Sequence, residues 1–286
     1  MQIKTIGLIG KGTMGQGIAH VATLSGYTVI VRDIDCDKTK KGVAQVEKTW
    51  SRLVEKGKLE AAKVEESKSR LKPAQSLTDL KDCDLIIEAV TEDVAIKTDL
   101  FKELNTIVKS DAIFATNTSS ISVTQLAAAS GRPSQFVGMH FFNPVPMMKL
   151  VEIIRGLQTS DDTFNTVFEV SKTLGKVPAA IKDSAGFAVN RLLLPMINEA
   201  FYLLQEGVAD APTIDEVMKL GANHPMGPLT LGDFVGLDVT LAAMEVLHRD
   251  FGDSKYRPCP LLRKYVESGW LGRKTGRGVY NYTEQK

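Results

Sequence analysis

The sequence has little of what would place it in a membrane, on a nucleic acid or in a disulfide-stabilised fold. Its three cysteines, Cys36, Cys83 and Cys259, form no close pair, which fits unpaired thiols in a reducing compartment. No apolar run approaches the roughly 20 residues that a membrane helix needs. A formal net charge of +1 provides no general field for nucleic acid or anionic lipid. We therefore expect no nucleic-acid partner and no membrane partner, and any phosphate binding must be local.

Metal-binding and targeting signals are equally scarce. The sequence has no CxxC motif and no histidine cluster, so we expect no metal site. A predicted strand begins almost at the N-terminus, which leaves no room for a signal or transit peptide in the sequence as given, and we expect a cytoplasmic protein. The 286 residues, with 43% apolar and 24% charged side chains, predict a soluble globular chain of two domains.

The first 33 residues carry the clearest motif. The apolar run Ile6–Ile9 is followed by a glycine-rich turn, a helical segment from Gln16 to Ser25, and a second strand that ends at Asp33. A glycine-rich turn between a strand and a helix, with an acid ending the next strand, is the dinucleotide-binding fingerprint. An empty strand–helix–strand turn is the simpler alternative. The turn itself reads Gly10-Lys11-Gly12-Thr13-Met14-Gly15.

Each part of this motif has a physical role. Gly10 permits the tight turn, Gly12 lets the backbone approach a pyrophosphate, and Gly15 allows close packing of helix and sheet. The helix N-terminus offers N–H groups and partial positive charge to phosphates. Asp33 can accept hydrogen bonds from a ribose and would repel a 2′-phosphate, so we expect NAD rather than NADP. Arg32 is the dissenting residue, since an arginine can pair with that phosphate.

Strands alternate with helices through the first two-thirds of the chain, which predicts a mostly parallel Rossmann-type sheet with right-handed crossovers. After Ser184 the periodicity is helical, apart from a glycine-rich tail at 276–282 that we expect to be extended. We predict an α/β domain over 1–184 and an all-helical domain over 185–286. In the second domain, Thr213 and Glu216 resemble a capping box at a helix start. The expected strands are 6–9, 27–33, 85–90, 112–116, 136–140, 149–154 and 177–181.

A histidine and a glutamate are candidates for proton transfer. His140 ends a predicted strand, and Glu152 lies in the next strand, beyond a turn with two prolines. If the strands are neighbours, the carboxylate can hold one imidazole nitrogen and make the other more basic. That arrangement suits removal of a hydroxyl proton while hydride leaves the same carbon. A structural role for both residues is the alternative.

Two polar residues are candidates for contacting a substrate oxygen. Ser119 lies in Asn117-Thr118-Ser119-Ser120, directly after a predicted strand. The alternative is a helix cap, but Ser122 is better placed to cap the helix that follows. Asn190 begins the first helix of the second domain, where capping is again the alternative.

Five motifs occurring together resemble the L-3-hydroxyacyl-CoA dehydrogenase family, most closely the bacterial 3-hydroxybutyryl-CoA dehydrogenases. The resemblance covers essentially the whole chain. Its motifs are the glycine turn, the Asn117 motif, His140-Phe141-Phe142-Asn143-Pro144, Asn223-His224-Pro225-Met226-Gly227-Pro228 and Gly272-Arg273-Lys274-Thr275-Gly276.

The resemblance implies an oxidoreductase that moves hydride between C3 of an acyl-CoA thioester and NAD, and a homodimer formed through the helical domain. His140 would be the general base, Glu152 its partner, and Ser119 and Asn190 contacts to the 3-oxygen. The implied cofactor contacts are Gly10, Gly12, Thr13, Met14, Gly15, Asp33, Glu92, Lys97, Asn117, Ser119, Asn143 and Lys274.

A basic helix face gains meaning from this resemblance. Lys41, Lys48, Arg52 and Lys56 fall on one face of the helix predicted at about 37–57, which by itself reads as a solvated surface. Arg52 and Lys56 match family positions that contact coenzyme A. Two residues depart from the pattern: Arg52 stands where lysine is more usual, and Lys11 stands where the family has a small residue. Lys11 either adds a cation near the pyrophosphate or points to solvent.

Two other functions remain open. A related hydroxyacid or sugar-acid dehydrogenase would not use coenzyme A, and the basic helix face argues against it. A non-catalytic, crystallin-like NAD-binding protein is the second alternative, and the joint presence of Ser119, His140, Glu152 and Asn190 argues against it.

Overall fold

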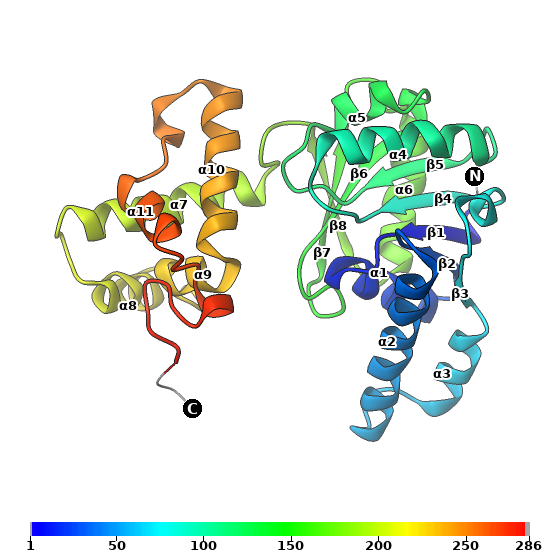
Figure 1. Ribbon diagram of the computed structural model, residues 1–286, viewed down its shortest axis with the longest axis horizontal. Helices are drawn as coiled ribbons and strands as arrows, with labels where there is room; N and C mark the ends of the chain where they lie inside the picture. The colour runs from blue at the N-terminus through cyan, green and yellow to red at the C-terminus, as the bar shows by residue number, and fades with distance from the viewer. Residues whose placement is uncertain (1, 284–286) are drawn as a thin grey trace. The chain divides into compact units, whose positions relative to one another are not determined.

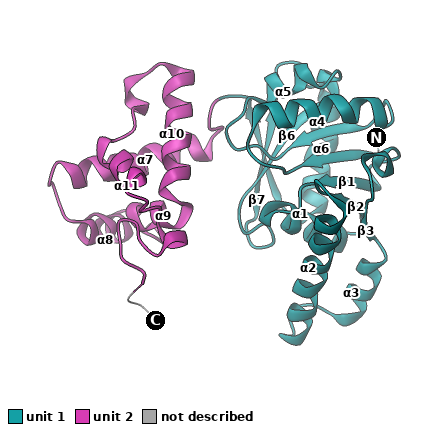
Figure 2. Cartoon of the chain, in the orientation of Figure 1, with its two compact units in different colours: residues 1–184 teal, residues 185–286 magenta. Residues whose placement is uncertain are grey.

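The computed structural model describes residues 2–283. The chain divides into two compact units, Met1–Ser184 (unit 1) and Ala185–Lys286 (unit 2), which Figure 2 shows in different colours. Unit 1 is an α/β domain and unit 2 is helical, so the predicted fold class is confirmed. Among the described residues, no helix is both long enough and apolar enough to cross a membrane.

Unit 1 is built on an eight-stranded sheet with the order β3-β2-β1-β4-β5-β6-β7-β8. Pairing is parallel from β3 through to β6, antiparallel between β6 and β7, and parallel again between β7 and β8. The order reverses at β1 and β4, the switch point where such sheets bind ligands at the carboxyl ends of their strands. The strands are β1 Thr5–Ile9, β2 Thr28–Arg32, β3 Leu71–Pro73, β4 Leu85–Glu88, β5 Ile113–Thr116, β6 Phe136–Phe141, β7 Leu150–Arg155 and β8 Val177–Lys182.

Helices cover both faces of this sheet, because alternate side chains of a buried strand point to opposite faces. One core cluster joins strand residues such as Leu8 and Ile87 to α1, α2, α3 and α6. On the other face, the ring of Phe101 in α4 packs 5.4 Å from Phe114 and 4.7 Å from Phe136, and α4 and α5 lie together there (Figure 1). The helices are α1 Thr13–Leu24, α2 Cys36–Glu55, α3 Ala61–Lys68, α4 Val94–Ile107, α5 Val123–Ala129 and α6 Asp161–Thr173.

Unit 2 packs its helices around a core that includes Ile197, Phe201, Leu229 and Leu237. The segment after residue 272 is held by isolated bridges between Gly272 and Arg277 and between Arg277 and Asn281, rather than by a strand. The helices of this unit are α7 Val189–Gln205, α8 Ala211–Gly221, α9 Pro228–Val235, α10 Leu237–Phe251 and α11 Pro260–Glu267.

Several element ends differ from the sequence-based expectation. α1 begins at Thr13, so Gly15 lies within the first helical turn. The expected cap at Thr213 is wrong: α8 begins at Ala211, and the Asp210 side chain caps it by accepting a hydrogen bond from the backbone N–H of Thr213 at 3.0 Å. Strand β3, helix α11 and four 3-10 turns were not expected; the turns are η1 Leu77–Leu80, η2 Pro133–Gln135, η3 Ser254–Tyr256 and η4 Arg273–Thr275.

Candidate active site

In the glycine turn after β1, two of the three glycines leave no room for a side chain, whereas the third has open space beside it. Gly10 has φ +104°, and a Cβ there would lie 2.3 Å from the carbonyl oxygen of Ala89. A Cβ at Gly15 would lie 1.8 Å from the carbonyl oxygen of Gly10, which directly follows β1, so Gly15 lets α1 begin close to the end of that strand. A Cβ at Gly12 would meet nothing within 4 Å. The backbone at Gly12 is therefore accessible to a phosphate group.

A cavity of about 620 Å³ adjoins this turn and is lined by Gly10, Gly12 and Asp33 together with apolar side chains that include Leu77 and Leu100. Such a volume suits a small ligand or part of a cofactor. Within the turn, Thr13 is exposed and Met14 is half-buried. The turn, the acid and the apolar wall fit the adenosine and pyrophosphate portions of a dinucleotide.

Asp33 is tied to the backbone around it. Its Oδ2 accepts a hydrogen bond from the N–H of Lys11 at 2.7 Å, and its Oδ1 accepts one from the N–H of Ile34 at 2.8 Å. A carboxylate has about four acceptor positions, so both oxygens keep capacity for a ligand hydroxyl. Asp33 thus holds the glycine turn against the end of β2 and also faces the cavity.

Lys11 and Arg32, the two cationic residues that weaken the expectation of NAD, each contact neighbouring residues of unit 1. The aliphatic stem of Lys11 packs over Gly42 of α2, where an added Cβ would lie 2.7 Å from the Lys11 Cβ. The guanidinium of Arg32 donates long hydrogen bonds to the carbonyl oxygen of Ile34 at 3.4 Å and to Thr39 Oγ1 at 3.5 Å. The stem of Lys11 therefore packs against α2, and Lys11 and Arg32 both also line the cavity beside the glycine turn.

His140 and Glu152 meet as the sequence predicted. They are directly opposed in the antiparallel β6–β7 pair, and His140 Nδ1 lies 2.8 Å from Glu152 Oε2. Both are buried, with 6% and 1% of their surface exposed. The contact with Glu152 at Nδ1 fixes the orientation of the imidazole ring. The Phe142 ring lies 4.6 Å from the imidazole, a contact that the sequence did not indicate.

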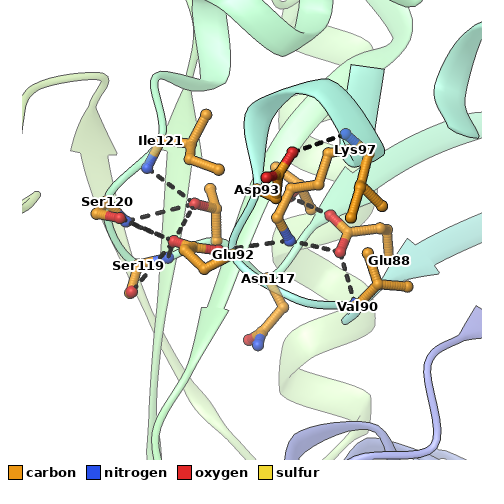
Figure 3. Close-up of polar contacts among 12 residues, drawn as sticks. Glu88, Val90, Glu92, Asp93, Lys97, Asn117, Ser119, Ser120 and Ile121 are labelled. Atoms are coloured by element: carbon orange, nitrogen blue, oxygen red, sulfur yellow. Dashed lines mark hydrogen bonds and ion pairs between the residues drawn. The ribbon is translucent and has the colours of Figure 1, made fainter. Parts of the chain in front are cut away.

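The Asn117–Ser120 loop, which follows β5, is organised by one carboxylate. Glu92 Oε1 accepts hydrogen bonds from the N–H groups of Ser119 and Ser120 at 2.8 and 3.0 Å, and from the Thr118 hydroxyl at 2.6 Å (Figure 3). Burial raises the pKa of Glu92, but the Lys97 charge and these hydrogen bonds outweigh it, so the net pKa is lowered. Asn117 links the loop to β6, because its Oδ1 accepts from the N–H of Phe141 at 2.9 Å. As expected, Ser122 rather than Ser119 caps α5.

Lys97 lies behind this loop, with 1% of its surface exposed. Its Nζ is 2.5 Å from Glu88 Oε1 and 3.4 Å from Glu92 Oε2. Glu88 is fully buried at the end of β4 and was not expected to matter, because the run around it reads as an ordinary buried strand. A single acid in a buried apolar strand needs a charged partner. This requirement is the feature of the sequence that could have identified Glu88 as part of a polar cluster.

The remaining predicted residues lie elsewhere in their own units. Asn143 is exposed in the loop after β6, and Arg52 and Lys56 are exposed on α2 and just beyond its end. In unit 2, Asn190 is half-buried in the first turn of α7, whose N-cap is Ala188, so Asn190 is not the capping residue. Lys274 is exposed, and its Nζ donates to Asp238 Oδ2 at 2.6 Å. The functional roles of these residues stay predictions.

Comparison with known proteins agrees with this geometry. Residues 5–184 match the family described as "3-hydroxyacyl-CoA dehydrogenase, NAD binding domain", and residues 186–282 match the "3-hydroxyacyl-CoA dehydrogenase, C-terminal domain". The chain is 53% identical to the 3-hydroxybutyryl-CoA dehydrogenase of Bradyrhizobium diazoefficiens over 99% of this chain and 97% of that protein. It is 41% identical to the human mitochondrial hydroxyacyl-coenzyme A dehydrogenase over 98% of this chain and 91% of that protein.

Solved structures give the same result. The crystal structure of (S)-3-hydroxybutyryl-CoA dehydrogenase from Ralstonia eutropha superposes with a TM-score of 0.97 at 53% identity, covering 99% of this chain and 100% of that one. Both family domains, high identity over nearly full length and the same fold lead to one conclusion. The chain belongs to the 3-hydroxyacyl-CoA dehydrogenase family of oxidoreductases, and unit 1 is its NAD-binding domain.

Proposed function

We propose that the protein catalyses the reversible, NAD(H)-dependent oxidation of (S)-3-hydroxybutyryl-CoA, or of another short-chain 3-hydroxyacyl-CoA, to the 3-ketoacyl-CoA. The observation that carries this proposal is the buried His140–Glu152 pair, 2.8 Å apart at the ligand-binding edge of the sheet. The names of the relatives support the short-chain substrate. The exposed Arg52 and Lys56 on and beside α2 supply positive charge for the phosphates of coenzyme A.

Proton transfer follows from the geometry of this pair. A neutral His140 takes the proton of the 3-hydroxyl group at Nε2 during oxidation, and Glu152 stabilises the imidazolium that forms. In reduction His140 returns that proton, and Ser119 donates a hydrogen bond to the 3-oxygen. For Asn190, a contact to this oxygen is what the family resemblance implies. When bound, the nicotinamide accepts or supplies the hydride at C3.

We infer that NAD is the cofactor rather than NADP. Asp33 presents a carboxylate to the cavity that would repel a 2′-phosphate. Lys11 and Arg32 also line this cavity, and the guanidinium of Arg32 already donates hydrogen bonds to Thr39 and to the Ile34 carbonyl. Asp33→Asn keeps an oxygen for the Lys11 N–H but removes the charge. NADH affinity should fall roughly tenfold, because a hydrogen bond to a charged group is worth about 1.5 kcal/mol. Fluorescence titration with NADH and NADPH measures both affinities; an unchanged NADH affinity argues against the ribose role.

The catalytic proposal is tested by His140→Gln. Turnover of acetoacetyl-CoA with NADH should fall about 10²–10⁴-fold, because a glutamine amide cannot exchange a proton with the 3-oxygen, while NADH binding is kept. Unchanged turnover would remove His140 from the mechanism. Comparing rates on acetoacetyl-CoA, longer 3-ketoacyl-CoA esters and free acetoacetate identifies the substrate class. Equal rates on free acetoacetate favour the hydroxyacid dehydrogenase alternative, and NADH binding without any turnover favours a non-catalytic protein.

We also propose a cytoplasmic homodimer formed through unit 2. Unit 2 exposes large apolar side chains, including Val217 at 55%, Leu220 at 78% and Phe234 at 51% exposure. Exposed apolar side chains on a helical domain are suited to burial against a second copy. Light scattering coupled to size-exclusion chromatography measures the mass directly, and a monomer at micromolar concentration would contradict the proposal.

A further inference from the structure

Glu88, Lys97 and Glu92 form a continuous polar chain that ends at the Ser119 loop. At its inner end, the Thr116 hydroxyl donates to Glu88 Oε2 at 2.7 Å. Glu88 Oε1 accepts from Lys97 Nζ at 2.5 Å, and Lys97 Nζ lies 3.4 Å from Glu92 Oε2. Figure 3 shows Lys97 between the two glutamates and Glu92 between Lys97 and the loop.

Burial along this chain is graded. The side chains of Glu88 and Lys97 are 0% and 1% exposed, whereas that of Glu92 is 35% exposed. An ammonium group taken out of water needs charged partners, so Lys97 cannot leave the two carboxylates without a large penalty. Glu88 thus anchors Lys97 from the inside. Lys97 in turn limits where the Glu92 carboxylate can lie.

Glu92 passes this constraint to the loop. Besides its three shortest contacts, its Oε1 lies 3.0 Å from Ser120 Oγ and 3.2 Å from Ser119 Oγ. A carboxylate oxygen has about two acceptor positions, so the donors around it share them. The Ser119 hydroxyl makes the longest of these contacts. It can therefore turn to a substrate oxygen while the backbone N–H groups of Ser119 and Ser120 stay fixed on Glu92.

We propose that Glu88, acting through Lys97 and Glu92, is a positioning residue that holds the Ser119 hydroxyl in place for the reaction. The inference rests on the proposed function, because it takes Ser119 as a contact to the 3-oxygen. It also gives Lys97 a role in holding the loop, beside the cofactor contact that family resemblance implies. Glu88 itself touches neither substrate nor cofactor.

Glu88→Gln tests the proposal with little change in side-chain volume. The amide keeps one oxygen for Lys97 or the Val90 N–H but removes the charge that anchors the ammonium group. We expect kcat with acetoacetyl-CoA to fall roughly 10- to 100-fold, since small displacements of a positioned group have effects of that size. The KM for acetoacetyl-CoA should change little, and kcat is measured at saturating NADH because Lys97 and Glu92 are also implied cofactor contacts. An unchanged kcat would overturn the proposal.

A double-variant cycle separates positioning from a general structural effect. Glu88→Gln is made in the wild type and in Ser119→Ala. If Glu88 acts through the Ser119 hydroxyl, its loss in the Ser119→Ala background should change kcat by less than about twofold. An equal loss in both backgrounds would show that Glu88 does not act through Ser119.

The opposite end of β4 provides a control at an ion pair of the same length but greater exposure, 14% for Asp84 and 34% for Lys109. Asp84 pairs with Lys109 at 2.5 Å, the same distance as Glu88 to Lys97. Asp84→Asn removes a charge from an ion pair of the same length and should leave kcat unchanged. If it lowers kcat as much as Glu88→Gln does, lost stability explains both effects and the proposal fails.

A second variant covers poor folding of Glu88→Gln. Thr116→Val removes the hydroxyl that donates to Glu88 at nearly constant volume. Thr116→Val should lower kcat several-fold, and only when Ser119 is present. An unchanged kcat would overturn the proposal. Failure of the proposed function looks different: either the wild type shows no turnover of acetoacetyl-CoA with NADH, or His140→Gln and Ser119→Ala both keep wild-type turnover. If those two variants lose turnover but Glu88→Gln does not, only the present inference fails.

Discussion

The buried acids of the two units have different kinds of partner. In unit 1, Glu88 pairs with the Lys97 ammonium and Glu152 with the His140 imidazole. In unit 2, Asp215 accepts from the N–H groups of Leu229 and Thr230 at 2.7 and 2.9 Å and from the Tyr280 hydroxyl at 2.8 Å. The acids of unit 1 contact basic side chains, whereas Asp215 contacts the start of a helix and a phenol.

Asp233 follows the second pattern. Its Oδ1 accepts from the N–H of Val279 at 2.9 Å, and its Oδ2 from the N–H of Tyr280 and the Tyr282 hydroxyl, each at 3.0 Å. Burial raises the pKa of Asp233 despite these hydrogen bonds. Asp215 and Asp233 together fasten the C-terminal segment to α9. Asp215 and Asp233 bind backbone N–H groups and phenols and so stabilise the fold of unit 2, whereas we propose that Glu88 and Glu152 control the basic side chains that they contact.

The largest expected effect comes from Glu152→Gln. An amide can present its N–H to Nδ1 of His140, which puts the imidazole proton on Nε2 and removes the base. We expect turnover to fall about 10²–10⁴-fold. NADH affinity, measured by fluorescence, should stay near that of the wild type. If the variant gives less folded protein but the folded fraction keeps full activity, Glu152 has a structural role like that of Asp215 and Asp233 in unit 2.

The glycine turn, most of the strands and the His140–Glu152 pairing could be predicted from the sequence. Each depends on local pattern: a glycine at a positive φ, short apolar runs, and two strands joined by a proline-containing turn. The Ser122 cap was predictable for the same reason. Such features are decided within a few residues.

The polar chain behind Ser119 could not be predicted, because its members come from different strands and a helix. Glu88 reads as one acid in an apolar run, and the sequence does not say which cation reaches it. The cap of α8 was misassigned because the spacing of Thr213 and Glu216 matches a capping box. In the structure Asp210 is the cap, and a proline follows it in the first turn of the helix. β3 was missed because three residues are too few for a periodic signal.

His20 sharpens the comparison, because it is an ionisable group of unit 1 that is buried without a charged partner. Its Nδ1 has no hydrogen-bond partner among residues 2–283, and its ring lies 6.2 Å from that of Trp50. Burial, and then the nearby Lys176 charge, lower the pKa of His20 from 6.5 to about 4. As pH falls below 6.5, the unfolded chain binds a proton that the folded chain refuses until about pH 4.

Stability should therefore fall through this window, by roughly 3 kcal/mol once pH reaches the lower end. His20→Gln removes the titrating group. Urea unfolding between pH 7 and 4 measures the difference between variant and wild type, in which the contributions of other groups cancel. A difference that stays constant with pH would show that His20 titrates alike in both states.

Asp215→Ala gives the smallest of these effects and tests the architectural side. It leaves the first N–H groups of α9 and the Tyr280 hydroxyl without their acceptor, which should lower the stability of unit 2 by about 2 kcal/mol.

The two tryptophans report on the units separately, since Trp50 lies in unit 1 and Trp270 in unit 2. In a Trp50→Phe background, fluorescence of Trp270 should show unfolding at lower urea. In a Trp270→Phe background, Trp50 unfolding and NADH affinity should be unchanged, because the hydrogen bonds of Asp215 join α8 to α9 and to Tyr280, all within unit 2. If Asp215→Ala lowers NADH affinity as much as Asp33→Asn does, Asp215 does not have a purely structural role and the comparison between the two kinds of acid is wrong.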